Sequence, residues 1–374
     1  MLLRKHGVFL RGIALVLGLV VFCAASKAED VPQGIVLIGW DGAQRDHVKE
    51  MMARNELPYL AALAKDGTMV DIDIVTGATD TKAGWAQILT GYAPEKSRVY
   101  SNSRFEPIPE GYTIFERLEK FLGPGHIETV ALISKKGNLG IAGPKNIPLQ
   151  EWREKQNKKK IDNSKPGLGD LGNGKVVKEN GSEYVLEPGE PYSLTKNKVD
   201  LFINDLGKNA KVGVLAMEDL EKFHNRRFFL FVHFCEPDQS GHKYGENSQE
   251  YSDGLKLDDL WTGKIVDKLK ELKMYDKTLV YVTVDHGFDE GKKGHAYAPY
   301  VFVATNDKKV VRSGTREDIA PTILKRFGMD LPKIDPPLDG IPLDEPAPKR
   351  VAPKEKPNVQ TPSTPASKAK VEMM

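Results

Sequence analysis

Short hydrophobic runs alternate along this chain with segments whose hydrophobic positions recur at three- and four-residue steps. The runs are bounded by turn residues and are rich in β-branched or aromatic side chains, which is typical of buried strands. They span residues 34–39, 129–134, 228–234, 278–284 and 300–305. Helical periodicity falls between them, over residues 43–55, 113–123, 193–207, 212–223 and 255–273. The alternation predicts an α/β domain with a largely parallel sheet and helices on both faces.

Two stretches break this rhythm. Residues 135–192 contain runs such as KQNKKK and GLGDLGNGK, which are rich in glycine and lysine and show little periodicity. We expect them to form an insertion over the main domain, either a mobile loop or a small cap. Residues 346–374 are rich in Pro, Lys, Ser and Thr and almost free of large hydrophobic side chains, so we expect a disordered tail.

The N-terminus has the pattern of a secretory signal. Basic residues precede a hydrophobic run of 14 residues, and Ser26 and Ala28 occupy the positions of small residues before a cleavage site. A membrane-spanning helix needs about 20 residues, so cleavage is favoured over an uncleaved anchor. We therefore predict that residues 1–28 are removed and that residues 29–345 form an exported domain, periplasmic or extracellular, without a stable membrane span. Cys235 is then the only cysteine left, inside a run expected to be buried.

Composition narrows the class of protein further. The chain has 374 residues, 40% of them hydrophobic, which is enough to bury a sizeable core in one large domain. A formal net charge of +2 gives no basis for binding a nucleic-acid polymer by bulk electrostatics. Function must therefore be sought in individual side chains.

Acidic and imidazole groups follow three of the predicted strands. In an open parallel sheet, ligands bind beyond the carboxyl ends of the strands, so side chains just after each strand are expected to share one edge. A further histidine follows nine residues after the last of them. The six residues are Asp41, Asp238, His242, Asp285, His286 and His295. Three carboxylates and three imidazoles form a donor set suited to Zn²⁺ or Mn²⁺ rather than Ca²⁺.

Four motifs containing these residues carry a family resemblance. GIVLIGWDGAQRDHV, TKAGWAQILTGYAPEKS, EPDQSGHKYG and VDHG resemble, in order, the signatures of the alkaline phosphatase superfamily, most nearly its type I phosphodiesterase and nucleotide pyrophosphatase branch. The resemblance covers roughly residues 34–305. It implies an alkaline-phosphatase-like sandwich with a central, mostly parallel sheet. It also implies a nucleophile nine residues before the Thr90-Gly91 pair, which is Thr81.

The resemblance further implies two divalent metal ions, zinc with manganese as the alternative. One metal would be held by Asp41, Thr81, Asp285 and His286, and the other by Asp238, His242 and His295. His295 is the only histidine after His286, and its short separation from His286 is more similar to the sulfatase or phosphomutase branches.

Thr81 also has a physical argument of its own. It opens a helical pattern, so its hydroxyl and the free N–H groups of the first turn would meet an anion at the positive end of the helix. A simple N-cap is the alternative reading. The resemblance places Asn102, 21 residues after Thr81, as a donor to a phosphoryl oxygen. The chain departs from the family pattern at two positions near Thr81, with Ala83 in place of proline and Trp85 in place of histidine.

These features predict an exported two-metal phosphoesterase that hydrolyses a small-molecule phosphodiester through a phosphothreonine intermediate. A phosphomonoesterase or phosphomutase is the alternative, because Lys82 could add a cation beside the nucleophile, although it is expected to point to solvent. A sulfatase is less favoured because Thr81 stands where a modifiable Cys or Ser is needed. A non-catalytic binding relative would have no use for the complete ligand set. The substrate, the native metal and the oligomeric state stay open.

Overall fold

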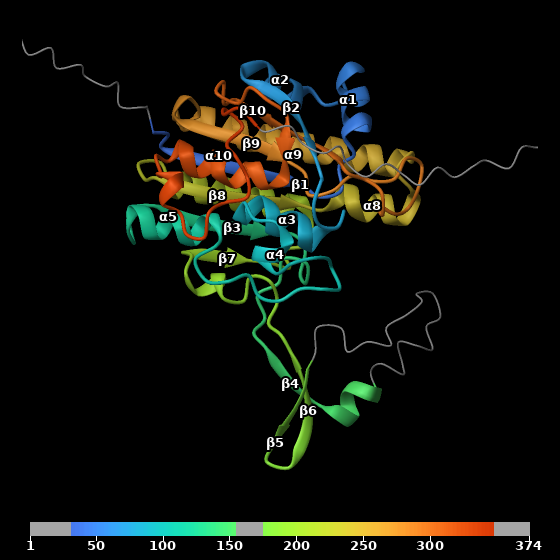
Figure 1. Ribbon diagram of the computed structural model, residues 1–374. Helices are drawn as coiled ribbons and strands as arrows, with labels where there is room; N and C mark the ends of the chain where they lie inside the picture. The colour runs from blue at the N-terminus through green and yellow to red at the C-terminus, as the bar shows by residue number, and fades with distance from the viewer. Residues whose placement is uncertain (1–30, 155–174, 348–374) are drawn as a thin grey trace, which may run out of the picture. The chain divides into compact units, whose positions relative to one another are not determined.

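The computed structural model describes residues 31–154 and 175–347, and an eight-stranded sheet forms its centre (Figure 1). The strand order is β11-β2-β10-β9-β1-β8-β3-β7. The strands are β1 (Gly34–Trp40), β2 (Thr68–Asp73), β3 (Glu128–Ile133), β7 (Leu201–Ile203), β8 (Phe228–Phe234), β9 (Thr278–Thr283), β10 (Tyr300–Thr305) and β11 (Gly314–Thr315). All pairs are parallel except those of β10, which runs antiparallel to β2 and β9. The predicted, largely parallel sheet is confirmed.

Two groups of helices cover the sheet. In one group α9 packs against α2, α7 and α8, and in the other α10 packs against α3 and α5 (Figure 1). Strands β1 and β8 are buried along their whole length, which requires cover on both faces. The helices are α1 (Arg45–Ala53), α2 (Pro58–Asp66), α3 (Thr81–Thr90), α4 (Pro94–Ser97), α5 (Ile114–Leu122), α7 (Asn209–Lys222), α8 (Glu236–Tyr244), α9 (Gln249–Glu271) and α10 (Ile319–Arg326). Among the described residues, no helix is both long and hydrophobic enough to cross a bilayer.

One predicted helix, residues 193–207, is wrong. The structure has a short 3₁₀ turn at Thr195–Asn197 and then β7, which pairs in parallel with β3 at the edge of the sheet. The hydrophobic residues of this segment happen to fall at helical steps, but three of them are consecutive in β7. Pairing with an available sheet edge overrides such a weak local pattern.

A second, three-stranded antiparallel sheet lies within residues 135–192, the stretch predicted to be an insertion. Its strands are β4 (Lys145–Pro148), β5 (Lys175–Glu179) and β6 (Ser182–Glu187), in the order β4-β6-β5. Residues 155–174 of this stretch lie outside the described part of the chain. So do the predicted signal, residues 1–28, and residues 348–374 of the predicted tail, and these remain predictions.

Helix α3 runs through the core beside the strand end that carries Asp285. Asp80 caps its N-terminus by accepting from the backbone N–H of Ala83 at 3.2 Å, and Gly91 ends it in the left-handed conformation, at φ 74°. A Cβ on Gly84 would lie 2.6 Å from the Cβ of Asp285, so a glycine is needed for this approach. Trp85 is fully buried, with its ring centroid 5.2 Å from that of Phe231, which makes it a core residue.

Candidate active site

The parallel strands bring most of the predicted site residues to one edge of the sheet. Strands β8, β1 and β9 are neighbours in the sheet. Past their carboxyl ends come Asp238 after β8, Asp41 after β1 and Asp285 after β9. All three carboxylates are buried. The connection between β9 and β10 carries both remaining imidazoles, those of His286 and His295, and has no regular secondary structure.

The opening residues of α8 explain the spacing of Asp238 and His242. Pro237 lies in the first turn, where its fixed φ suits a helix and its missing N–H costs nothing. Residues four apart lie on one helical face, so Asp238 Oδ1 and His242 Nε2 approach to 3.3 Å. The periodicity of this segment did not predict a helix, because it contains few hydrophobic residues.

The first group of donor atoms surrounds the Nε2 atom of His286. This nitrogen lies 3.3 Å from Thr81 Oγ1, 3.5 Å from Asp285 Oδ2 and 3.6 Å from Asp41 Oδ1. Bonds of about 2.0–2.2 Å to a tetrahedral zinc ion place the ligand atoms about 3.3–3.6 Å apart. These distances match three edges of one tetrahedral site. Asp238 Oδ1 lies 3.9 Å from the same nitrogen, so Asp238 borders both groups.

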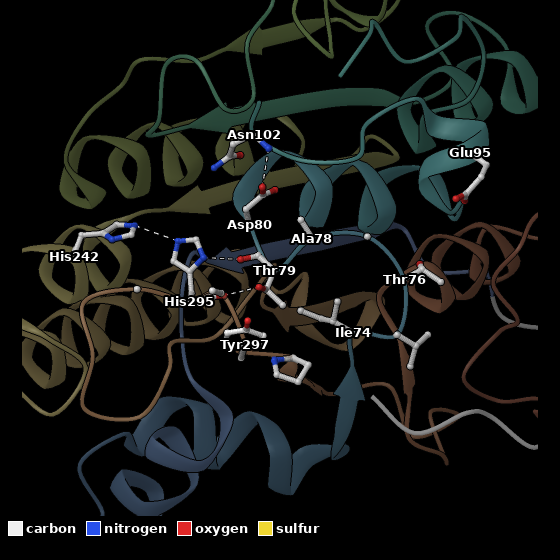
Figure 2. A pocket seen from close by; sticks show the side chains of 15 residues that line it. Ile74, Thr76, Ala78, Thr79, Asp80, Glu95, Asn102, His242, His295 and Tyr297 are labelled. Atoms are coloured by element: carbon white, nitrogen blue, oxygen red, sulfur yellow. Dashed lines mark hydrogen bonds between the residues drawn. The ribbon is translucent and has the colours of Figure 1, made fainter. Parts of the chain in front are cut away.

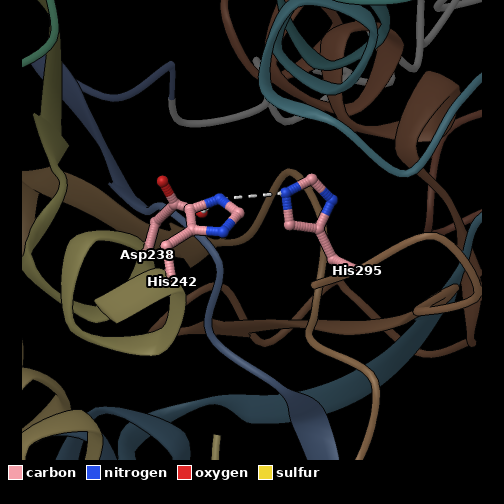
Figure 3. A group of neighbouring side chains, drawn as sticks. All are labelled: Asp238, His242 and His295. Carbon is pink, nitrogen blue, oxygen red and sulfur yellow. Dashed lines mark hydrogen bonds and ion pairs between the residues drawn. The ribbon is translucent and has the colours of Figure 1, made fainter. Parts of the chain in front are cut away.

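The second group consists of Asp238, His242 and His295 (Figure 3). The two histidine Nε2 atoms are 3.2 Å apart. His242 Nδ1 lies 2.9 Å from the Lys293 carbonyl oxygen, and His295 Nδ1 lies 2.6 Å from the Thr79 carbonyl oxygen. A carbonyl can only accept, so each Nδ1 carries a proton, and the Nε2 atom of each ring is the one that can offer a lone pair to a cation. Two lone pairs facing each other beside a carboxylate form a site for a cation, with both imidazoles fixed by their outer hydrogen bonds.

Burial and charge support the same reading. Burial and the nearby His295 lower the pKa of His286 to about 3, so its imidazole stays neutral and able to bind a metal. Burial and the negative charge of Asp41 raise the pKa of Asp285 well above its ordinary value. Asp285 Oδ2 and Asp238 Oδ1 are buried and have no hydrogen-bond partner within residues 31–154 and 175–347. Divalent cations would satisfy both oxygens, so the residues present fit two metal ions.

Lys135 is a member of the site that sequence reasoning missed. Its Nζ donates to Asp238 Oδ2 at 2.6 Å, to Asp41 Oδ1 at 2.9 Å and to Thr81 Oγ1 at 3.2 Å. Burial would lower the pKa of Lys135, but the neighbouring carboxylates outweigh it and raise that pKa above its ordinary value, so the side chain stays an ammonium. It lies in the stretch predicted to be an insertion, yet it follows β3 as Asp41 and Asp285 follow β1 and β9. The strand-end rule, applied to residues 129–134, would have found it.

His233 was also missed, because it lies inside the hydrophobic run of β8. Its Nε2 is 2.9 Å from Asp41 Oδ2, its Nδ1 is 2.9 Å from Ser134 Oγ, and it is fully buried. Burial would raise the pKa of Asp41, but Lys135 and His233 together hold it below its ordinary value. His233 therefore orients this carboxylate through Oδ2, and its Oδ1 faces the first group and Lys135.

At the start of α3, Thr81 does not cap the helix, so its hydroxyl is left to the first donor group and Lys135. Asp80, not Thr81, is the N-cap, and it also accepts from the backbone N–H of Asn102 at 2.7 Å. Asn102 Oδ1 in turn accepts from the backbone N–H of Lys82 at 2.9 Å, which directs the amide to the first turn of the helix. The expectation that Lys82 points to solvent is wrong. It is only 7% exposed, because its Nζ donates to the Gly137 carbonyl oxygen at 2.6 Å.

A pocket of about 1130 Å³ opens beside the second group (Figure 2). His242 and His295 lie at one side of it and Asn102 at another, with residues 74–80 forming a wall. Among the residues that the structure describes, its lining contains two carboxylates, those of Asp80 and Glu95, and no lysine or arginine. The pocket is large enough to hold a small organic group next to the donor atoms.

Comparisons with known proteins agree with this arrangement. A family model described as type I phosphodiesterase / nucleotide pyrophosphatase matches residues 35–330. The chain is 22% identical over 282 residues to the Homo sapiens bis(5'-adenosyl)-triphosphatase ENPP4, covering 74% of this chain and 52% of that protein. It is 30% identical over 138 residues to a 2,3-bisphosphoglycerate-independent phosphoglycerate mutase of Wolbachia pipientis wMel, covering 34% of this chain and 26% of that protein. The chain thus spans about half the length of the human relative.

The fold is shared with solved structures of the same superfamily. A mutant alkaline phosphatase from the Antarctic bacterium TAB5 aligns with a TM-score of 0.50 and 14% identity, over 80% of this chain and 99% of that one. At this identity the likeness supports the fold alone, and it confirms the predicted alkaline-phosphatase-like architecture. The family model covers most of the chain and includes all the donor residues of both groups. The chain therefore belongs to the type I phosphodiesterase / nucleotide pyrophosphatase family.

Proposed function

We propose that this chain is an exported two-metal phosphoesterase that hydrolyses phosphodiesters, with Thr81 as the nucleophile. The observation that carries the proposal is the position of the Thr81 hydroxyl. Thr81 is the first residue of α3, and its hydroxyl oxygen belongs to the first donor group, 3.3 Å from His286 Nε2. A nucleophile in this place has the positive end of a helix beneath the phosphoryl group that it attacks.

Asp41, Thr81, Asp285 and His286 would hold one metal, and Asp238, His242 and His295 the other. Zinc is favoured by this mixture of imidazole and carboxylate donors, with manganese as the alternative. Bound divalent cations would favour the ionised form of the Thr81 hydroxyl and offset the charge that develops on phosphoryl and leaving oxygens. Adding zinc or manganese to metal-stripped protein and following phosphoester turnover tests this assignment.

The residues around Thr81 suit two successive in-line displacements. Thr81 Oγ1 attacks phosphorus and the alcohol leaves toward the pocket, which produces a phosphorylated threonine. Water then attacks the same phosphorus and restores the hydroxyl. The first N–H groups of α3 and the Asn102 amide would hold the oxygens that stay on phosphorus throughout. Within the described residues no acceptor contacts Asn102 Nδ2, so this group is left to donate to substrate.

Diester substrates are supported by the family and by the neutral amide of Asn102, which suits a phosphoryl group with a single negative charge. We expect bis-p-nitrophenyl phosphate to be turned over with a higher kcat/KM than p-nitrophenyl phosphate, at the same pH and in the same metal. Steady-state kinetics with both substrates measures the order. A clear preference for the monoester would instead place the protein with the monoesterases or phosphomutases.

A monoesterase or phosphomutase is the second candidate, and Lys135 is the observation that favours it. Its ammonium lies beside the nucleophile, where the sequence offered only Lys82 as a candidate cation. The similarity to a phosphoglycerate mutase over part of the chain points in the same direction. A sulfatase is less well supported, because Thr81 replaces the modifiable residue that such enzymes need.

A further inference from the structure

We propose that Lys135 is a catalytic residue that determines how well the site accepts phosphoryl groups with two negative charges. The inference rests on the proposed role of Thr81 and extends it to the substrate class. Its starting point is the contact between Lys135 Nζ and Thr81 Oγ1 at 3.2 Å, which joins an ammonium to the reacting oxygen.

The contacts of Lys135 separate this role from simple neutralisation of buried acids. Two of its three N–H groups serve the carboxylates Asp41 and Asp238. The third is directed at a hydroxyl, which has no charge to neutralise in its resting form. The side chain is only 13% exposed, so water screens this charge weakly.

The position of the ammonium matters most for the outer oxygens of the phosphoryl group. When Oγ1 bonds to phosphorus, those oxygens stand around Oγ1, next to Lys135 Nζ. Thr81 Oγ1 loses its proton to solvent as it bonds to phosphorus. The P–O bond to the leaving alcohol breaks, its electron pair departs with the alkoxide, and that oxygen is protonated by solvent, so Lys135 keeps its protons. A monoester carries one more negative oxygen than a diester through this step, and a nearby positive charge favours it selectively.

The backbone around Lys135 is held in place before any substrate binds. The Lys135 carbonyl oxygen accepts from the backbone N–H of Asp205 at 3.3 Å, and the Asn204 amide donates to the Lys136 carbonyl oxygen at 2.8 Å. The buried Lys82 adds the hydrogen bond to Gly137. Charge fixed in advance stabilises a transition state without the cost of reorganisation.

The test compares Lys135→Met and Lys135→Gln, which remove the charge, with Lys135→Arg, which keeps it. Lys136→Met is the matched control, because the Lys136 ammonium is exposed and pairs with Asp205 at 2.9 Å, away from both donor groups. Each protein is loaded with zinc and its metal content measured. Then kcat/KM is determined for p-nitrophenyl phosphate and bis-p-nitrophenyl phosphate, and the affinity for inorganic phosphate is measured by calorimetry.

We expect the ratio of monoester to diester kcat/KM to fall about tenfold or more in both neutral variants, with phosphate bound about tenfold more weakly at unchanged metal content. Lys135→Arg should lie closer to the wild type, and Lys136→Met should match it. An equal loss on both substrates, or unchanged phosphate affinity, would overturn the proposal. If a neutral variant needs more zinc to fill its sites, the kcat/KM ratio and the phosphate affinity are measured at saturating zinc, and those values decide whether the proposal holds.

These measurements keep the two hypotheses apart. A wild-type protein that turns over neither ester contradicts the proposed function. Phosphate calorimetry needs no turnover, so it still shows whether the Lys135 charge favours a phosphoryl dianion.

Discussion

Replacing Thr81 by alanine is expected to reduce kcat on any phosphoester by at least about a thousandfold, since removal of a catalytic nucleophile has effects of this size or larger. The substitution removes the nucleophilic oxygen and one methyl group. The helix should persist, because Asp80 is its N-cap and the other residues of α3 are unchanged. Steady-state kinetics of Thr81→Ala, with its zinc content and melting temperature, measures the effect.

Thr81→Ser is the matched control for this variant. It keeps the hydroxyl at the start of α3, so it should retain much of the activity that alanine removes. Both variants keep Asp41, Asp285 and His286, and a water molecule can replace one ligand oxygen, so zinc content should change little. Turnover at the wild-type rate in Thr81→Ala would rule out the phosphothreonine mechanism.

Removing His242 is expected to lower the number of tightly bound metal ions from about two per chain to about one. The second group would keep only Asp238 and His295, and two protein ligands hold zinc poorly. The first group does not include His242 and should stay loaded. His242 is about half exposed, so its loss should not threaten the fold. Activity should fall at least about a hundredfold and recover in part with excess zinc.

Elemental analysis of purified His242→Ala and His295→Ala measures this prediction. The matched control is His126→Ala, since His126 is exposed and belongs to neither donor group. Two ions that stay bound through dialysis in His242→Ala would mean that the assignment of Asp238, His242 and His295 to one metal is wrong.

Much of the fold could be predicted from the chain because the buried strands are short and continuously hydrophobic. The run at residues 228–234 coincides with β8, and residues 300–305 with β10. The direction of a strand is not encoded in such a run, which is why the antiparallel pairing of β10 could not be foreseen. Helix α8 was missed because its residues are mostly polar and its role is to carry ligands rather than to pack.

The donor residues were easier to predict than the residues that orient them. Asp41 and Asp285 stand directly after hydrophobic runs, where the strand-end rule locates them. His233 lies within a run, and only the folded sheet shows that it meets Asp41. Lys135 follows a hydrophobic run as Asp285 does, but it also opens a glycine- and lysine-rich stretch and was counted with that stretch. Its contact with Thr81 depends on β3 lying two strands from β1.

The connection between β9 and β10, which has no regular secondary structure, has a thermodynamic consequence. His286 near its start serves one donor group and His295 serves the other, while the backbone between them has no helix or strand of its own. Fixing each of its residues costs about 1–2 kcal/mol of conformational entropy. The first ion to bind at either group orders part of the connection, so the second ion binds with a smaller loss of conformational entropy. The two ions should therefore bind with positive cooperativity. At limiting zinc, native mass spectrometry would then find chains with no ion or two, and few with one.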